Sequence, residues 1–113
     1  MTASFTYWNN DKPCGAVVEH LKERGLDVFQ GFFVNYKDKT FEGRYTLEAI
    51  REGVSGSSVS HQGGEFKVAG KSRVKLSRTS INIDEKDTYK VVLNIYDNDE
   101  LLCADSIVVG GMP

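Results

Sequence analysis

Residues 43–66 constrain the fold of this chain more than any other stretch, and they read GRYTLEAIREGVSGSSVSHQGGEF. The first half alternates apolar and polar side chains with a period of two, as in a half-buried β-strand. Residues 57–62 alternate in the same way but contain almost no apolar side chain. Gly53 and Gly56 predict a turn between the two strands, because glycine adopts positive φ at little cost. The glycine pair at residues 63–64 predicts a second turn, which leads into a third strand.

The polar strand at residues 57–62 is the first feature that bears on function. A strand with so few apolar side chains can hydrogen-bond along its backbone, but it buries little surface. We therefore expect an exposed strand or an edge strand at this position.

The rest of the chain repeats the pattern of strand and turn, and no long helical pattern is present. Residues 26–36 form a long strand in which Gly31 predicts a bulge. We expect residues 41–51 to be its antiparallel partner across a charged turn. Residues 14–21 fit either one helix face or one strand face, and we favour the strand because the remainder is β. Separate short strands are expected at residues 73–76 and at Ile81 and Ile83, and a final hairpin is expected at residues 89–109.

Short strands with turns at regular spacing predict an all-β sandwich of about seven or eight strands. The 113 residues suit one domain, which we place at residues 14–110 between a flexible leader at 1–13 and a tail at 111–113. Within the leader, residues 5–7 are a candidate for a short strand. The side chains expected to point into the core share the parity of their strands. They are Tyr45, Leu47, Phe66, Val74, Leu76, Val91, Leu93 and Ile95.

Composition excludes several classes of protein. Hydrophobic residues make up 40% of the chain and aromatic residues 11%, which is too much for a disordered chain. The net charge of -2 argues against a basic nucleic-acid binder. No apolar run approaches the roughly 20 residues of a membrane helix, so we expect no membrane insertion. The first residues show no signal-peptide pattern, which fits a cytosolic protein and a mature exported domain equally well.

The two cysteines, Cys14 and Cys103, lack the spacing of a redox or zinc motif. The first and last strands of a sandwich are commonly neighbours, so a disulfide between them is geometrically reasonable. Two buried free thiols are the other reading. His20 could join the cysteines as a metal ligand, but three scattered residues make a weak metal site.

Catalytic and calcium-binding motifs are poorly supported. His61 lies among serines, but the run Gly-Ser-Ser-Val lacks the second glycine of a nucleophile elbow. The acidic run at residues 97–100 lacks the glycine and the distant glutamate of a calcium loop, so a hairpin turn explains it better. We therefore expect no enzyme activity and no cofactor.

A basic stripe follows the polar strand. Lys67, Lys71, Arg73 and Lys75 lie on one face if the strand register holds. Such lysines and arginines commonly serve solubility and protect an edge from aggregation. They could instead steer an acidic or polar partner toward the protein. Nucleic acid is disfavoured as that partner, because no aromatic residues interleave with the cations.

A set of short motifs follows in order along the chain: an early Cys14, Gly43-x-Tyr45-x-Leu47, Gly56-x-Ser58, Gln62-Gly63-Gly64-x-Phe66, Tyr89-x-Val91-x-Leu93 and Cys103. In this order and spacing they resemble the curli assembly factors of the CsgC/CsgH type, and the CsgH type more closely. The resemblance covers residues 14–104.

The resemblance implies a small periplasmic protein with an immunoglobulin-like β-sandwich of antiparallel strands. It also implies a chaperone-like inhibitor that keeps the secreted curli subunit from forming amyloid too early, through transient non-covalent contacts. The implied partner is the amyloidogenic curli subunit, with no cofactor, and the protein is expected to be a monomer. An immunoglobulin-like adhesion or structural module without chaperone activity is the alternative. The candidate client-binding residues are Lys67, Lys71, Arg73, Lys75, Ser58 and Gln62.

The cysteines depart from one branch of this family. Members of the CsgC type have a Cys-x-Cys motif, whereas this chain has Leu102-Cys103-Ala104. A dithiol redox role is therefore not expected here. The implied periplasmic location favours a disulfide between Cys14 and Cys103 over free thiols.

Overall fold

The computed structural model of the chain describes residues 2–7, 15–53, 56–81 and 86–110. These residues form eight β-strands and no helix. The strands are β1 (Thr2–Tyr7), β2 (Gly15–Glu23), β3 (Leu26–Asn35), β4 (Phe41–Gly53), β5 (Gly56–Val68), β6 (Ser72–Ile81), β7 (Thr88–Asp97) and β8 (Glu100–Gly110). The described part of the chain accordingly contains no helix with the length and apolar character to cross a membrane.

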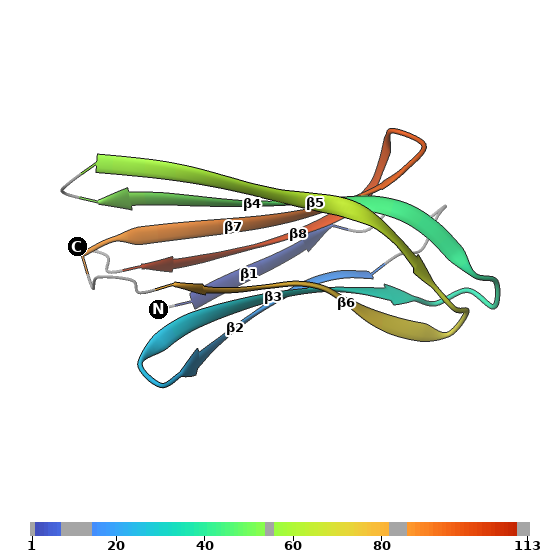
Figure 1. The fold of residues 1–113 in the computed structure, drawn as a ribbon, viewed down its shortest axis with the longest axis horizontal. Helices are drawn as coiled ribbons and strands as arrows, with labels where there is room; N and C mark the ends of the chain where they lie inside the picture. The colour runs from blue at the N-terminus through green and yellow to red at the C-terminus, as the bar shows by residue number, and fades with distance from the viewer. Residues whose placement is uncertain (1, 8–14, 54–55, 82–85, 111–113) are drawn as a thin grey trace.

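The strands form two antiparallel sheets that pack as a sandwich (Figure 1). The larger sheet has five strands in the order β1-β8-β7-β4-β5, and the smaller sheet has three in the order β2-β3-β6. Alternation along each strand directs one set of side chains between the sheets. The predicted all-β sandwich of antiparallel strands is confirmed.

The core between the sheets is built from buried side chains of both. They are Ala16, Val18, Phe29, Phe33, Leu47, Ala49, Val68, Tyr89, Val91, Leu93, Ile95, Leu102, Cys103 and Ile107. Of the residues predicted to point inward, Leu47, Val91, Leu93 and Ile95 are buried in this core, and Tyr45, Phe66, Val74 and Leu76 pack against it. The parity assignments are therefore confirmed.

The predicted pairing of residues 26–36 with residues 41–51 is wrong. β3 pairs with β2 and β6 in the smaller sheet, whereas β4 pairs with β5 and β7 in the larger one. The chain crosses from one sheet to the other between β3 and β4. Both strands present apolar side chains to the core, with Phe33 on β3 stacked against Phe41 on β4 at a centroid distance of 5.1 Å. They meet face to face across the core rather than edge to edge.

The second predicted turn, at residues 63–64, is also wrong. β5 runs without interruption from Gly56 to Val68, and neither Gly63 nor Gly64 has positive φ. A β-carbon at Gly63 would lie only 3.0 Å from the backbone carbonyl oxygen of Tyr45 on β4. The absence of a side chain at Gly63 therefore lets the neighbouring strand approach closely, so this glycine serves packing rather than a turn.

Two strand boundaries also differ from expectation. In the leader at residues 1–13 a short strand was considered at residues 5–7, and the structure has a longer one: Thr2–Tyr7 form β1, which pairs with β8 along its length. The separate strands expected at residues 73–76 and around Ile81 are one strand, β6. Ile83 lies outside the described residues.

Two other turn signals are confirmed. Gly56 has a φ of 127° and pairs with Gly53 at the end of the β4–β5 hairpin. Asn98 and Asp99 have φ values of 50° and 68°, as a tight hairpin turn requires. The register of β3 with β6 shifts between Gly31 and Phe32, where a bulge was predicted, but the extra residue is Leu76 of β6 and not a residue of β3. The ambiguous segment at residues 14–21 is a strand from Gly15 onward.

One core residue gives the fold a dependence on alkaline pH. Burial raises the pKa of Tyr89 above its ordinary value of 10.0, Arg51 opposes this, and Asp87 adds to it. The unfolded chain therefore loses this proton at a lower pH than the folded protein does. The contribution of Tyr89 to the free energy of unfolding is fully present below about pH 10. Above that pH, this group lowers the free energy of unfolding by at most about 1.4 kcal/mol per pH unit. Tyr89→Phe should flatten that fall in urea unfolding measured from pH 8 to 11. An unchanged slope would contradict the assignment.

Candidate functional site

The polar strand predicted at residues 57–62 forms an edge of the molecule, as expected. It belongs to β5, which ends the larger sheet, and among the described strands it pairs with β4 alone (Figure 1). All residues from Gly56 to Gly63 are exposed, and Val59 is exposed to 54%. We call residues 56–62 the polar edge.

Gln62 connects the polar edge to the smaller sheet. Its Nε2 donates a hydrogen bond to Thr79 Oγ1 on β6, at 2.9 Å. Ser58, the other candidate on this strand, is exposed and lies opposite Arg51 of β4. The edges of the two sheets, β5 and β6, therefore lie on the same side of the sandwich.

The four predicted cations are all exposed, but they do not share one face. Phe66 and Val68 point into the core, so Lys67 between them projects from the outer face of the larger sheet. Val74 packs against the core from β6, so Arg73 and Lys75 project from the outer face of the smaller sheet. The expectation that the four cations share one face is wrong. The odd-numbered residues Lys67 on β5 and Arg73 and Lys75 on β6 all point away from the core, but these strands belong to different sheets, so their outward side chains project from opposite faces of the sandwich. We call the four cations, Lys67, Lys71, Arg73 and Lys75, the basic rim.

The basic rim is held by local contacts. Lys71 lies in the turn between β5 and β6 with a φ of 56°, and its N–H donates to the carbonyl oxygen of Lys37 at 2.8 Å. The Arg73 guanidinium lies 4.2 Å from the ring centroid of Phe32. This cation–π contact fixes one cation of the rim and covers the Phe32 ring, which is only 5% exposed. Lys67 lies opposite Glu42 in the β4–β5 ladder.

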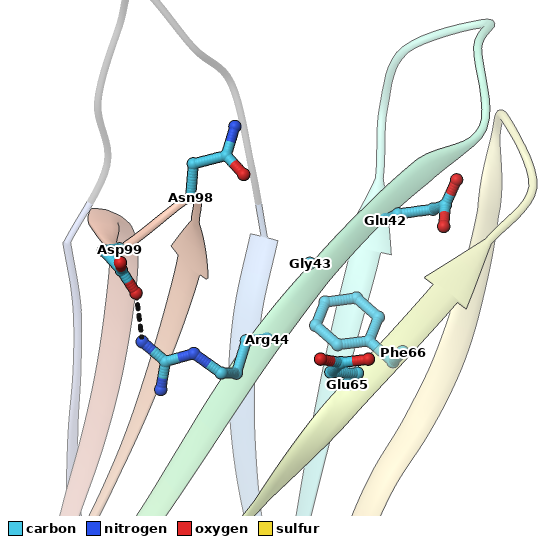
Figure 2. A pocket seen from close by; sticks show the side chains of 7 residues that line it. All are labelled: Glu42, Gly43, Arg44, Glu65, Phe66, Asn98 and Asp99. Carbon is cyan, nitrogen blue, oxygen red and sulfur yellow. Dashed lines mark hydrogen bonds and ion pairs between the residues drawn. The ribbon is translucent and has the colours of Figure 1, made fainter.

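A pocket of about 330 Å³ lies close to the rim, near the β7–β8 turn. Figure 2 shows Arg44 pointing from β4 toward Asp99, and their side chains approach to 3.2 Å. The same guanidinium lies 4.6 Å from the ring centroid of Tyr96. Glu42, Glu65, Gly43, Phe66 and Asn98 complete the lining. Three carboxylates surround one arginine that already has partners, so the pocket is polar and acidic.

The histidines have structural partners. His61 Nδ1 lies 3.3 Å from Glu48 on the neighbouring strand. His20 Nε2 lies 2.7 Å from Asp27 Oδ1, and its ring stacks on Phe29 at a centroid distance of 4.9 Å. Among the described residues no group of three His, Cys, Asp or Glu side chains could hold a metal ion.

A buried carboxylate that the sequence did not single out joins the two sheets. The Val18 N–H on β2 donates to Asp105 Oδ2 on β8 at 2.7 Å, and Asp105 is only 2% exposed. Cys103 lies two residues away and is fully buried. Cys14 lies outside the described residues, so the Cys14–Cys103 disulfide stays a prediction.

Comparison with known proteins supports the fold. No family model and no curated protein matches the chain. The solution structure of CsgH from R. palustris matches with a TM-score of 0.63 and 20% identity, over 81% of this chain and 89% of that chain. The curli protein CsgC from E. coli matches with a TM-score of 0.66 and 18% identity, over 81% of this chain and 96% of that chain. The resemblance to the CsgC/CsgH type is thus confirmed at the level of the fold.

Proposed function

We propose that this protein is a periplasmic, chaperone-like inhibitor of premature amyloid formation by a secreted curli subunit. The sandwich that it has in common with CsgH and with the curli protein CsgC supports this proposal. The observation that carries it is a separation of charge along the chain. Residues 56–81 contain five cations and one carboxylate, a net charge of +4, on a chain with a net charge of -2.

Amyloid grows when strands are added to an exposed backbone template. A local positive potential raises the rate at which a partner of opposite charge meets the protein. Because exposed ion pairs are individually weak, such contacts are short-lived. Brief contact with early oligomers delays nucleation without sequestering each client molecule, and this inhibition needs no cofactor.

Charge reversal on the basic rim tests the proposal. Lys71→Glu with Lys75→Glu changes two exposed cations and spares Arg73, which covers Phe32. Folding stability should change by no more than about 0.5 kcal/mol per site. In a dye-monitored fibrillation assay with the curli subunit, about tenfold more of the variant should be needed for the same lag time, the lower end of electrostatic steering. This difference should shrink at high salt, because charges are screened over about 8 Å at 0.15 M.

The matched control is Arg24→Glu with Lys90→Glu, which changes net charge equally. Arg24 is a turn residue with a φ of 52°, close to the 56° of Lys71, and Lys90 is an exposed strand residue like Lys75. This control should inhibit as the parent does. If the rim variant inhibits as well as the parent at low salt, the basic rim serves solubility and does not contact the client. A parent protein that leaves the lag time unchanged would favour the alternative, an adhesion or structural module.

A further inference from the structure

The two sheets have four edge strands, and within the described residues β5 is the one that lacks protection along its first half. An edge strand presents unpaired backbone N–H and C=O groups to other chains. Proteins protect such edges with bulges, lysines, prolines, short strands or covering contacts. The edges here are β1 and β5 in the larger sheet, and β2 and β6 in the smaller one.

Three of these edges carry such protection. β1 is short, with six residues. On β2, the Val18 N–H is taken by the buried carboxylate of Asp105. On β6, Ser77 and Lys75 pair with two consecutive residues of β3. Leu76 between them is therefore an extra residue, a bulge that interrupts the pairing. Exposed Arg73, Lys75 and Arg78 also project from β6.

Among the residues that the structure describes, β5 shows none of these features before Gln62, the seventh residue of the strand. Residues 56–64 read GSSVSHQGG, without lysine, arginine, aspartate, glutamate or proline. The register with β4 continues without a shift from Gly53↔Gly56 to Phe41↔Val68. The polar edge is therefore a continuous, exposed row of residues, and the hydrogen bond from Gln62 to Thr79 marks where β6 begins to flank it.

We infer that the polar edge binds one extended segment of the amyloid-forming client, which adds as a sixth strand to the larger sheet. This inference rests on the proposed function and specifies its contact. Backbone hydrogen bonds provide binding in strand addition, so the small side chains of Ser57, Ser58 and Ser60 suffice. A client strand paired here cannot pair with a growing fibril through the same backbone groups.

Charge decides between a client segment and a second copy of this chain. The edge is continuous with the basic rim, and residues 56–81 have a net charge of +4. Two copies paired edge to edge would bring together two surfaces of the same charge. A segment with carboxylates is instead attracted to the rim and held beside the edge. The geometry therefore points to an acidic or polar client segment.

Hydrogen exchange measured by NMR on the full chain tests strand addition. The probe is freshly desalted, monomeric curli subunit. We expect alternate amides within residues 56–62 to exchange at least tenfold more slowly with the probe than without it. Amides of β6 should be unchanged. Protection of the polar edge that rises with the concentration of this chain alone would overturn the inference, because the occupant would then be a second copy.

Two proline variants locate the contact. Successive N–H groups of a strand point to opposite sides, so either Ser57 or Ser58 directs its N–H to β4 and the other to the open edge. Of the two variants, Ser57→Pro and Ser58→Pro, the one that removes the edge-facing N–H should keep the parent's melting temperature. It should delay fibrillation at least fivefold less than the parent does. The other variant breaks a β4–β5 bond, and its lower melting temperature identifies it. A stable edge-facing variant with undiminished delay would contradict the inference.

The two proposals can fail separately. If the protein delays fibrillation but the polar edge gains no protection, strand addition is wrong and the proposed function stands. If the polar edge is protected without any delay, strand addition stands and the proposed function is wrong. If neither occurs, both are wrong.

Discussion

Leu93→Ala should lower the free energy of unfolding by about 2–5 kcal/mol, because it leaves a cavity in a fully buried site. Leu93 lies in the middle of β7 and is 0% exposed. A β-carbon added at Gly31 of β3 would lie 3.5 and 3.6 Å from the two methyl carbons of Leu93. This leucine therefore packs directly on the backbone of the opposite sheet, and its loss weakens the contact between the sheets. Urea unfolding followed by far-UV circular dichroism measures the change.

Leu101→Ala is the matched control, since the same atoms are removed from a side chain that is 45% exposed. Its unfolding free energy should change by no more than about 0.5 kcal/mol, as for most surface substitutions. Equal stability of Leu93→Ala and the parent would mean that β7 does not face the core as described. A helical spectrum of the parent would contradict the whole sandwich.

Strand faces could be predicted from this sequence because alternation is a local property. Each inward side chain, such as Leu47 or Val91, is recognised from its neighbours two residues away. The same holds for tight turns, where Asn98 and Asp99 tolerate positive φ. The fold class follows from these local signals without any knowledge of pairing.

Strand partners could not be predicted in the same way. Alternation states which side chains are buried, but it does not state which strand lies beside which. The prediction paired β3 with β4 because they are consecutive, whereas the chain changes sheets between them. The glycines at residues 63–64 show a related limit, since a glycine pair within a strand has the same local sequence signal as a turn.

The candidate site was affected by the same limit. The cations of the basic rim were recognised correctly as exposed, but these odd-numbered residues come from strands of two different sheets and from the turn between them. Only the arrangement of strands shows that Lys67 and Arg73 project from opposite outer faces. The contact between Asp105 and Val18 joins residues 87 positions apart, and no local pattern marks it. Long-range polar contacts of this kind become visible only when the sheets are assembled.

Loss of the predicted disulfide between Cys14 and Cys103 should have the other large effect on stability. The bond would close a loop of about 90 residues, which the chain-entropy model values at about 4–5 kcal/mol before strain. Cys103 is fully buried on β8. β2 begins at Gly15, the residue after Cys14, and is held to β8 by the bond from Val18 to Asp105. The strand that follows Cys14 in the sequence is therefore already joined to the strand that contains Cys103.

Thiol titration of the denatured, non-reduced protein tests the bond directly, and we expect no reactive thiol. Two thiols per chain in air-oxidised protein would exclude it. Urea unfolding with and without reductant then measures its contribution. Cys14→Ser should unfold at the same urea concentration in both conditions, because it has no bond to lose. The parent should unfold at the same urea concentration as this variant only in the presence of reductant, because the reductant breaks the disulfide and so removes its constraint on the unfolded chain. A parent that is insensitive to reductant would mean that the two sheets are held together by the core and Asp105 alone.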